Sequence, residues 1–245
     1  LSPGGTIIEA TAGNTGLGIA FAALNKGYRV IFVVPEKFSA EKQVLMQALG
    51  AELVHTPRAQ GMLGAAAKAE ELKQEIPGAI TLKQFENPAN PEIHYLTTGP
   101  EIYEELDGQI DYFVSGAGSG GTFSGIMKYF REKNPGIKGV LADPWGSVIG
   151  GGEHGDYEIE GIGNDFIPAT MDTGLIDKVY KITDGEALAG VRSLALKEGI
   201  FAGTSSGAAL AAALKLAASE ARGNIVLPII DRAERYFSKH ILEGG

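Results

Sequence analysis

The sequence predicts an α/β fold in two lobes, each built on a mostly parallel sheet that is flanked by helices. Two observations support this prediction. Short β-branched runs alternate with helical patterns along the whole chain, which is typical of β-α-β units. The segment 86–91 interrupts this alternation with two Asn-Pro pairs, which favour turns. We therefore expect a smaller lobe over residues 1–90 and a larger lobe over residues 91–245.

The first lobe shows a regular series of strands and helices. Gly27 and Gly50 follow two of the helical patterns, at the position where a glycine commonly ends a helix. Pro35 ends the expected strand 29–34, which is apolar after Arg29. The expected strands are 6–10, 29–34, 52–55 and 79–85, and the expected helices are 15–26, 40–49 and 61–74. Strands that are separated by helices favour a parallel sheet covered on both faces.

The second lobe resumes the same alternation. The expected helices are 91–106, 122–133, 184–197 and 205–219, and the expected strands are 112–115, 139–142, 178–182 and 224–230. The segment 150–163 contains six glycines and little apolar periodicity, so we expect a mobile loop there.

Composition excludes several functional classes. The 245 residues, 44% of them hydrophobic, are enough for a sizeable core, and a net charge of −9 argues against a nucleic-acid partner. The chain has no cysteine, and its four histidines show no ligand spacing, so we expect no metal site. No stretch is long and apolar enough to cross a bilayer, so we expect no membrane association and a cytoplasmic location.

Three turns rich in glycine and hydroxyl residues provide the functional signal. They cover residues 11–16, 118–122 and 203–207, and each stands where a helix is expected to begin. The N–H groups at a helix start can bind an anion without any basic side chain, so three such turns indicate one ligand with several polar groups. The first turn could instead contain Asn14 as a helix N-cap, and the third could simply cap an Ala-rich helix.

The turn before the helix 122–133 also fits a dinucleotide-binding pattern. Gly116–Gly121 reads G-x-G-x-x-G, and the next strand is followed by Asp143, at a suitable distance for an acidic ribose ligand. An NAD-binding protein therefore stays open as an alternative.

Six motifs together resemble the fold-type II pyridoxal-phosphate enzymes, specifically the cysteine synthase/cystathionine β-synthase family, over essentially the whole chain. They are Gly-Asn-Thr-Gly at 13–16, Gln-Phe-Glu-Asn-Pro-Ala-Asn-Pro at 84–91, Gly-Ser-Gly-Gly-Thr at 118–122, Glu-Gly-Ile-Gly at 160–163, Ser-Ser-Gly at 205–207 and Glu-Arg-Tyr at 234–236. The segments 11–16 and 142–147 are most similar to the bacterial, O-acetylserine-dependent cystathionine β-synthases. Cysteine synthases usually carry Ser where Ala12 stands.

The resemblance implies pyridoxal 5'-phosphate (PLP) as the cofactor and a role for each motif. The residues that would hold the cofactor phosphate are Gly118, Ser119, Gly120, Gly121 and Thr122. Asn14 would bond the ring hydroxyl, and Ser205 would meet the pyridine nitrogen. The residues that would bind the substrate carboxylate are Thr11, Ala12, Gly13, Asn14, Thr15 and Gln84.

The chain departs from the family pattern at two places. The Schiff-base lysine of relatives lies in an Asn-Pro-x-x-Ser-x-Lys-Asp-Arg segment before the first motif, and no lysine of this sequence matches it. We therefore assign no catalytic residue within the chain, and expect this lysine upstream of Leu1, in a missing N-terminal segment. Near the end, relatives read Pro-Asp-Ser-x-Glu-Arg-Tyr, whereas Arg232 stands here in place of the serine.

The resemblance implies a β-replacement reaction on serine or O-acetylserine. Homocysteine as the second substrate would give cystathionine, and sulfide would give cysteine. The expected partners are these small amino-acid and thiol substrates and a second copy of the chain in a homodimer. A serine or threonine dehydratase of the same fold type is another enzymatic alternative, and the absent lysine leaves open a non-catalytic binding protein.

Overall fold

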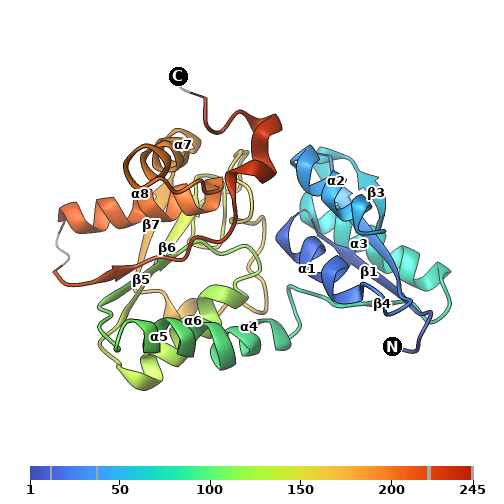
Figure 1. Cartoon of the computed structure of the whole chain (residues 1–245), viewed down its shortest axis with the longest axis horizontal. Coiled ribbons are helices and arrows are strands. Elements are labelled where there is room, and N and C mark those ends of the chain that lie inside the picture. Colours follow the sequence, from blue (N-terminus) through green and yellow to red (C-terminus); the bar gives the residue numbers. More distant parts are fainter. Residues whose placement is uncertain (12, 37, 220–221, 244–245) are drawn as a thin grey trace. The chain divides into compact units, whose positions relative to one another are not determined.

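The computed structural model describes residues 1–11, 13–36, 38–219 and 222–243, and the chain divides into two compact units (Figure 1). Unit 1 comprises Leu1–Lys83 and Glu234–His240, and unit 2 comprises the chain between these segments and the residues from Ile241 onward. Each unit holds a four-stranded sheet whose described pairings are all parallel, which confirms the predicted fold class. The division lies at residue 83, earlier than the expected boundary after residue 90.

Unit 1 follows the expected order of elements. They are β1 (Thr6–Ala10), α1 (Asn14–Ala23), β2 (Arg29–Pro35), α2 (Ala40–Ala48), β3 (Glu52–Thr56), the short helix η1 (Arg58–Gln60), α3 (Gly61–Glu75) and β4 (Ile80–Thr81). The strands lie in the order β3-β2-β1-β4.

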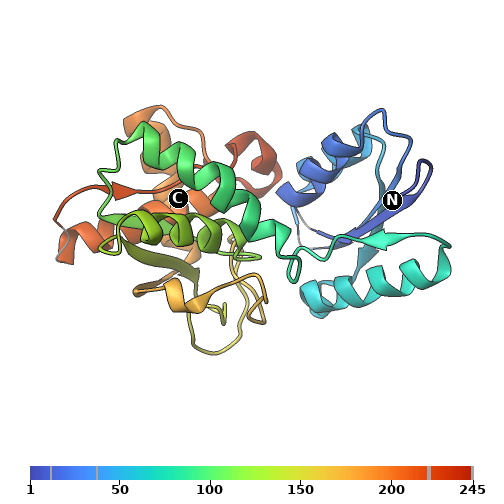
Figure 2. The same ribbon diagram turned by 90° about the horizontal axis from the view of Figure 1, so that it is seen from below.

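The two faces of the unit 1 sheet are covered by different helices because successive strand side chains point to opposite sides. Phe32 and Val34 of β2 pack with apolar residues of α1 and α2. Ile31 and Val33 of the same strand pack with Ala65 and other residues of α3. Figure 2 shows α1 and α3 on opposite sides of these strands. The nearly continuous apolar run of β2 is therefore explained by burial on both faces.

Unit 2 contains a second set of alternating elements. They are α4 (Ala89–Ile93), the π-helical turn η2 (His94–Thr98), α5 (Gly99–Glu105), β5 (Tyr112–Ser115), α6 (Gly121–Lys133), β6 (Lys138–Pro144), η3 (Thr173–Leu175), β7 (Lys178–Ile182), α7 (Asp184–Ser193), the π-helical turn η4 (Leu194–Glu198), α8 (Thr204–Ser219) and β8 (Ile225–Val226). The strand order is β7-β6-β5-β8. A last helix, η5 (Ala233–Lys239), carries the chain back to unit 1.

The core of unit 2 is also divided by its sheet. Phe113 and Leu141 pack on the face that α6 covers. Val114 and Val140 pack on the opposite face, against alanines of α7 and α8. Figure 1 shows α6 on one side of β5 and β6, with α7 and α8 on the other. The glycine-rich turn before α6 directly follows the largely buried strand β5.

Two strands are much shorter than the sequence predicts. The expected strand 79–85 forms only at Ile80–Thr81, because the next two amides, those of Leu82 and Lys83, donate to the buried carboxylate of Glu9 at 2.8 and 3.1 Å. The expected strand 224–230 forms only at Ile225–Val226. Pro228 follows and has no N–H group to donate to a sheet.

Candidate functional site

The turn between β5 and α6 leads directly into a helix start, where the first backbone N–H groups have no partner within the helix. Its central residue, Gly120, is the N-cap of α6 and has a φ of +84°, a left-handed conformation that favours glycine. The first turn of α6 has no acidic residue, whereas Arg131 and Lys133 lie in its last turn. This charge distribution leaves the positive end of the helix dipole available to an anion.

The glycines of this turn are required by close packing. A Cβ at Gly118 would lie 2.7 Å from the carbonyl oxygen of Gly161, and a Cβ at Gly121 would overlap the side chain of Asn90. The Gly163 N–H donates to the Ala117 carbonyl at 2.8 Å, so the segment 160–163 lies against the turn. Larger residues in the turn would displace these neighbours.

A hydrogen-bond network fixes the serine of the turn. Asn90 donates through Nδ2 to Ser119 Oγ at 2.9 Å and to the Gln84 carbonyl at 2.8 Å. The Thr170 hydroxyl donates to the Ser119 carbonyl at 2.6 Å and to the Gln84 carbonyl at 3.4 Å. Asn90 and Thr170 therefore hold Gln84, an expected substrate residue, beside the expected phosphate turn within unit 2.

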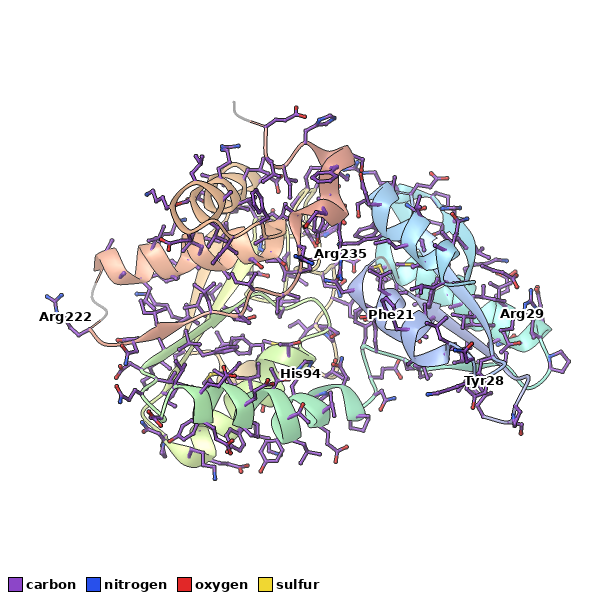
Figure 3. All side chains as sticks on the ribbon, viewed as in Figure 1. Phe21, Tyr28, Arg29, His94, Arg222 and Arg235 are labelled. Atoms are coloured by element: carbon purple, nitrogen blue, oxygen red, sulfur yellow. The ribbon has the colours of Figure 1, made fainter. Side chains whose placement is uncertain are left out.

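Thr122 is held by a histidine. Its Oγ1 lies 3.0 Å from His94 Nε2, and His94 Nδ1 lies 3.0 Å from Thr98 Oγ1. A neutral imidazole has one donor and one acceptor nitrogen, so it can join both hydroxyls. Burial lowers the pKa of His94 below its ordinary value. His94 is labelled beside α4 and α6 in Figure 3.

The start of α8 meets the same region of unit 2. Thr204 Oγ1 accepts from the Glu160 N–H at 3.0 Å, and Ser206 Oγ accepts from the Ile230 N–H at 3.2 Å. Ser205, which stands between them, is buried, and its Oγ would lie 3.8 Å from a Cβ at Gly161. The segment 160–163 thus touches both Ser205 and the 118–122 turn. Two of the three predicted turns are brought together by it.

The remaining predicted turn, residues 11–16, lies in unit 1. Thr11 is buried, and its Oγ1 accepts from the N–H groups of Gly13 and Gly16 at 3.4 and 3.1 Å, so it shapes the loop. Gly13 is the N-cap of α1, which replaces the alternative of Asn14 in that position. Thr15 is exposed. Ala12 lies outside the described residues.

Asn14 is engaged by a distant residue of the same unit. Arg235 Nη1 donates to Asn14 Oδ1 at 2.8 Å. Arg235 belongs to the segment 234–240, which the chain returns to unit 1 after completing most of unit 2.

The acidic residue that the dinucleotide alternative requires has another role. Asp143 is fully buried and forms an ion pair with Lys181 at 2.6 Å, and its Oδ2 also accepts from the Gly150 N–H at 2.9 Å. This carboxylate anchors the beginning of the 150–163 segment and is not accessible to a ribose.

Within the described ranges, no group of three or more acidic or histidine side chains could hold a metal ion. No helix in that part of the chain combines the length and the hydropathy needed to cross a bilayer.

Comparisons with known proteins agree with the geometry of the turns. A family model described as "Pyridoxal-phosphate dependent enzyme" matches residues 2–231. The chain belongs to the pyridoxal-phosphate dependent enzymes. Within them it is a fold-type II member of the cysteine synthase/cystathionine β-synthase family.

Three relatives illustrate this membership. The chain is 52% identical to the O-acetylserine dependent cystathionine beta-synthase of Bacillus subtilis, over 100% of this chain and 80% of that protein. It is 48% identical to a cysteine synthase of Helicobacter pylori, over 96% of this chain and 78% of that protein. The crystal structure of the O-acetylserine dependent cystathionine beta-synthase from Helicobacter pylori matches with a TM-score of 0.94 and 48% identity, covering 98% of this chain and 79% of that one.

The described residues fit PLP. A dianionic phosphate suits the start of α6, because the first N–H groups of a helix have no intrahelical partner and the first turn here has no acidic residue. A pyridine nitrogen suits the buried hydroxyl of Ser205, which brings no charge into the site.

Sequence reasoning did not identify Asn90, His94 and Arg235 as site residues. Asn90 and Arg235 stand inside quoted motifs, so the signal was present without a role attached to it. The contact of His94 with Thr122 joins residues 28 positions apart, and no local sequence pattern indicates it.

Proposed function

We propose that this enzyme catalyses β-replacement on O-acetylserine or serine, with homocysteine as the thiol and cystathionine as the product. The observation that carries the proposal is the meeting of the 118–122 turn, the segment 160–163 and Ser205 within unit 2. An anion site and a neutral hydroxyl in one region match the two ends of a phosphorylated pyridine. The relatives with this activity in their names support the choice of reaction.

When bound, PLP supplies an electron sink for negative charge at the substrate α-carbon. The residues Gly118–Thr122 hold its phosphate through backbone N–H groups and the two hydroxyls. Ser205 meets the ring nitrogen with a hydroxyl, which, unlike a carboxylate, does not hold that nitrogen protonated. A neutral hydroxyl at this position, in place of a carboxylate, would favour loss and replacement of the β-substituent over transamination.

The substrate carboxylate is bound, in this proposal, by the N–H groups and side chains of residues 11–15 with help from Gln84. The loop precedes α1, whose N-terminal dipole favours an anion. Gln84 is held next to Ser119 by Asn90 and Thr170, so substrate and phosphate binding share one supporting network.

Cysteine synthesis from O-acetylserine and sulfide is the second candidate. It is supported by the relative named cysteine synthase, which is as similar to this chain as the crystallised cystathionine beta-synthase. The two candidates differ only in the thiol.

Product analysis distinguishes the candidates. The full-length protein is loaded with PLP and given O-acetylserine or serine with either homocysteine or sulfide. Cystathionine as the main product supports the proposal. A strong preference for sulfide identifies a cysteine synthase, and keto acid with ammonia in the absence of a thiol identifies a dehydratase. No product in any mixture contradicts all three.

A further inference from the structure

The contact between Arg235 and Asn14 determines which atom of the Asn14 amide can meet a ligand. Arg235 Nη1 lies 2.8 Å from Asn14 Oδ1, and both residues belong to unit 1 (Figure 3 labels Arg235). A guanidinium group carries five N–H donors and no acceptor, so only the amide oxygen can face it. The amide nitrogen of Asn14, Nδ2, then points away from Arg235.

We propose that Arg235 is a positioning residue that fixes the Asn14 amide so that Nδ2 donates a hydrogen bond to the ring oxygen of PLP. This inference rests on the proposed function, in which Asn14 meets the ring hydroxyl. A donor at that oxygen stabilises its ionised form, whereas a rotated amide would present a carbonyl oxygen and oppose ionisation.

The segment that carries Arg235 is anchored on α2. Lys42 Nζ donates to the hydroxyl of Tyr236 at 2.6 Å and lies 4.0 Å from the centre of its ring, and both side chains are buried. The N–H and hydroxyl of Ser238 donate to the carboxylate of Glu41 at 2.6 and 2.7 Å. These contacts follow Arg235 directly in the chain, so its backbone is held in place when the guanidinium reaches Asn14.

The same anchor lies next to the loop that contains Asn14. A Cβ at Gly13 would be 3.4 Å from Lys42 Nζ. The C-terminal segment therefore supports residues 13 and 14 from two directions: through Lys42 behind Gly13, and through Arg235 at Asn14. This is the arrangement expected when a ligand group must be oriented by supporting residues.

The test compares variants of the full-length protein by PLP binding and by titration of the ring-hydroxyl absorbance with pH. Arg235→Ala should weaken PLP affinity by about ten- to hundredfold, the range expected for a hydrogen bond to a charged group, and should raise the apparent pKa of the ring hydroxyl. Asn14→Asp keeps an acceptor for Arg235 but has no N–H donor, so it should show the same two changes. Arg235→Lys should recover part of both.

Arg29→Ala is the matched control. Arg29 is an exposed arginine of unit 1 that donates to both carboxylate oxygens of Glu52 at 2.7 Å, and its removal should leave affinity and titration unchanged. Thr122→Val tests the phosphate turn separately.

The outcomes separate the inference from the proposed function. If Asn14→Asp and Thr122→Val weaken PLP binding but Arg235→Ala leaves both affinity and the ring titration at wild-type values, the positioning role is wrong and the site assignment stands. If none of the three variants changes PLP affinity, the assignment itself fails. Arg235→Ala could also lower the PLP affinity and leave the titration of the ring hydroxyl unchanged. That result would indicate a general structural effect and would overturn the positioning role, which requires a change at the ring oxygen.

Discussion

At the scale of single residues, the expected phosphate turn depends on polar side chains that the turn itself does not contain. Asn90 holds Ser119, and His94 joins Thr122 to Thr98. Half-buried polar groups of this kind are stable only when they are hydrogen-bonded, so each partner constrains the other. His94 is also titratable, which makes this part of the structure sensitive to pH.

The folding stability should fall below about pH 6.5 in part because of His94. Its pKa is lowered by burial from 6.5, so at pH values between the folded and unfolded pKa the unfolded chain binds more protons than the folded chain. The contribution of neutral His94 to the free energy of unfolding is fully present above pH 6.5, and it is lost as the pH falls through the pKa of His94 in the folded state. Urea unfolding of the wild type and of His94→Gln from pH 8 to pH 5 measures this: the variant should lose less stability over that range.

His55→Gln provides the control for this titration. His55 is an exposed histidine that bonds Gln43 Oε1 at 2.8 Å, so this variant shows whether replacing a histidine outside the turn has the same effect as replacing His94. Parallel profiles for the wild type and His94→Gln would show that His94 does not contribute.

At the scale of elements, the strand–turn–helix unit of β5 and α6 provides the candidate anion site. The strand is largely buried, the turn places Gly120 in the left-handed region, and α6 begins at the next residue. The tightness of this connection comes from Met171 and the segment 160–163, which pack on the turn. The element therefore has no room for side chains at its glycines.

Gly120→Ala should destabilise the protein more than Gly27→Ala. Both glycines have a positive φ, +84° and +69°, and that conformation costs an alanine about 1 kcal/mol. A Cβ at Gly120 would also lie 2.5 Å from Met171 Cβ, which adds about 1–3 kcal/mol of overpacking, whereas a Cβ at Gly27 meets nothing within 4 Å. Denaturant titration of both variants checks the difference, and PLP affinity should fall only in Gly120→Ala. Equal losses of stability would contradict the packing argument.

At the scale of the whole molecule, the chain does not complete one unit before it begins the other. Unit 1 is formed by residues 1–83 and by 234–240, so its final segment is contributed after most of unit 2. This segment covers Lys42, whose side chain is 1% exposed. The integrity of unit 1 therefore depends on residues near the C-terminal end.

Tyr236→Phe should lower the free energy of unfolding by about 1.5–3 kcal/mol, the range for a hydrogen bond to a charged group, because the buried ammonium of Lys42 loses the hydroxyl at 2.6 Å. Tyr28→Phe is the matched change in the same unit. The Tyr28 hydroxyl reaches the Leu1 carbonyl at 3.5 Å in an exposed position, and its loss should cost less than about 0.5 kcal/mol. Thermal unfolding of the two variants measures this difference. Equal unfolding midpoints would show that the contact between Tyr236 and Lys42 does not contribute to stability.

Much of the fold was predictable from local patterns. The strands at 6–10, 112–115 and 178–182 have the predicted bounds, and the helices that follow the second and third glycine-rich turns begin within one residue of the expected position. The strands expected at 79–85 and 224–230 were predicted too long, since Glu9 and Pro228 divert the backbone there. Apolar periodicity does not reveal a buried carboxylate that competes for strand amides.

Local sequence patterns were enough to predict the order of elements and the position of the glycine-rich turns, because periodicity, glycine and proline act on the backbone over a few residues. Which side chains meet became visible only in the folded chain. Arg235 reaches Asn14 across 221 positions, Thr204 accepts from residue 160, and Asp143 pairs with Lys181 instead of facing a ligand. Such partners are selected by packing between distant segments, and no local pattern in the chain records them.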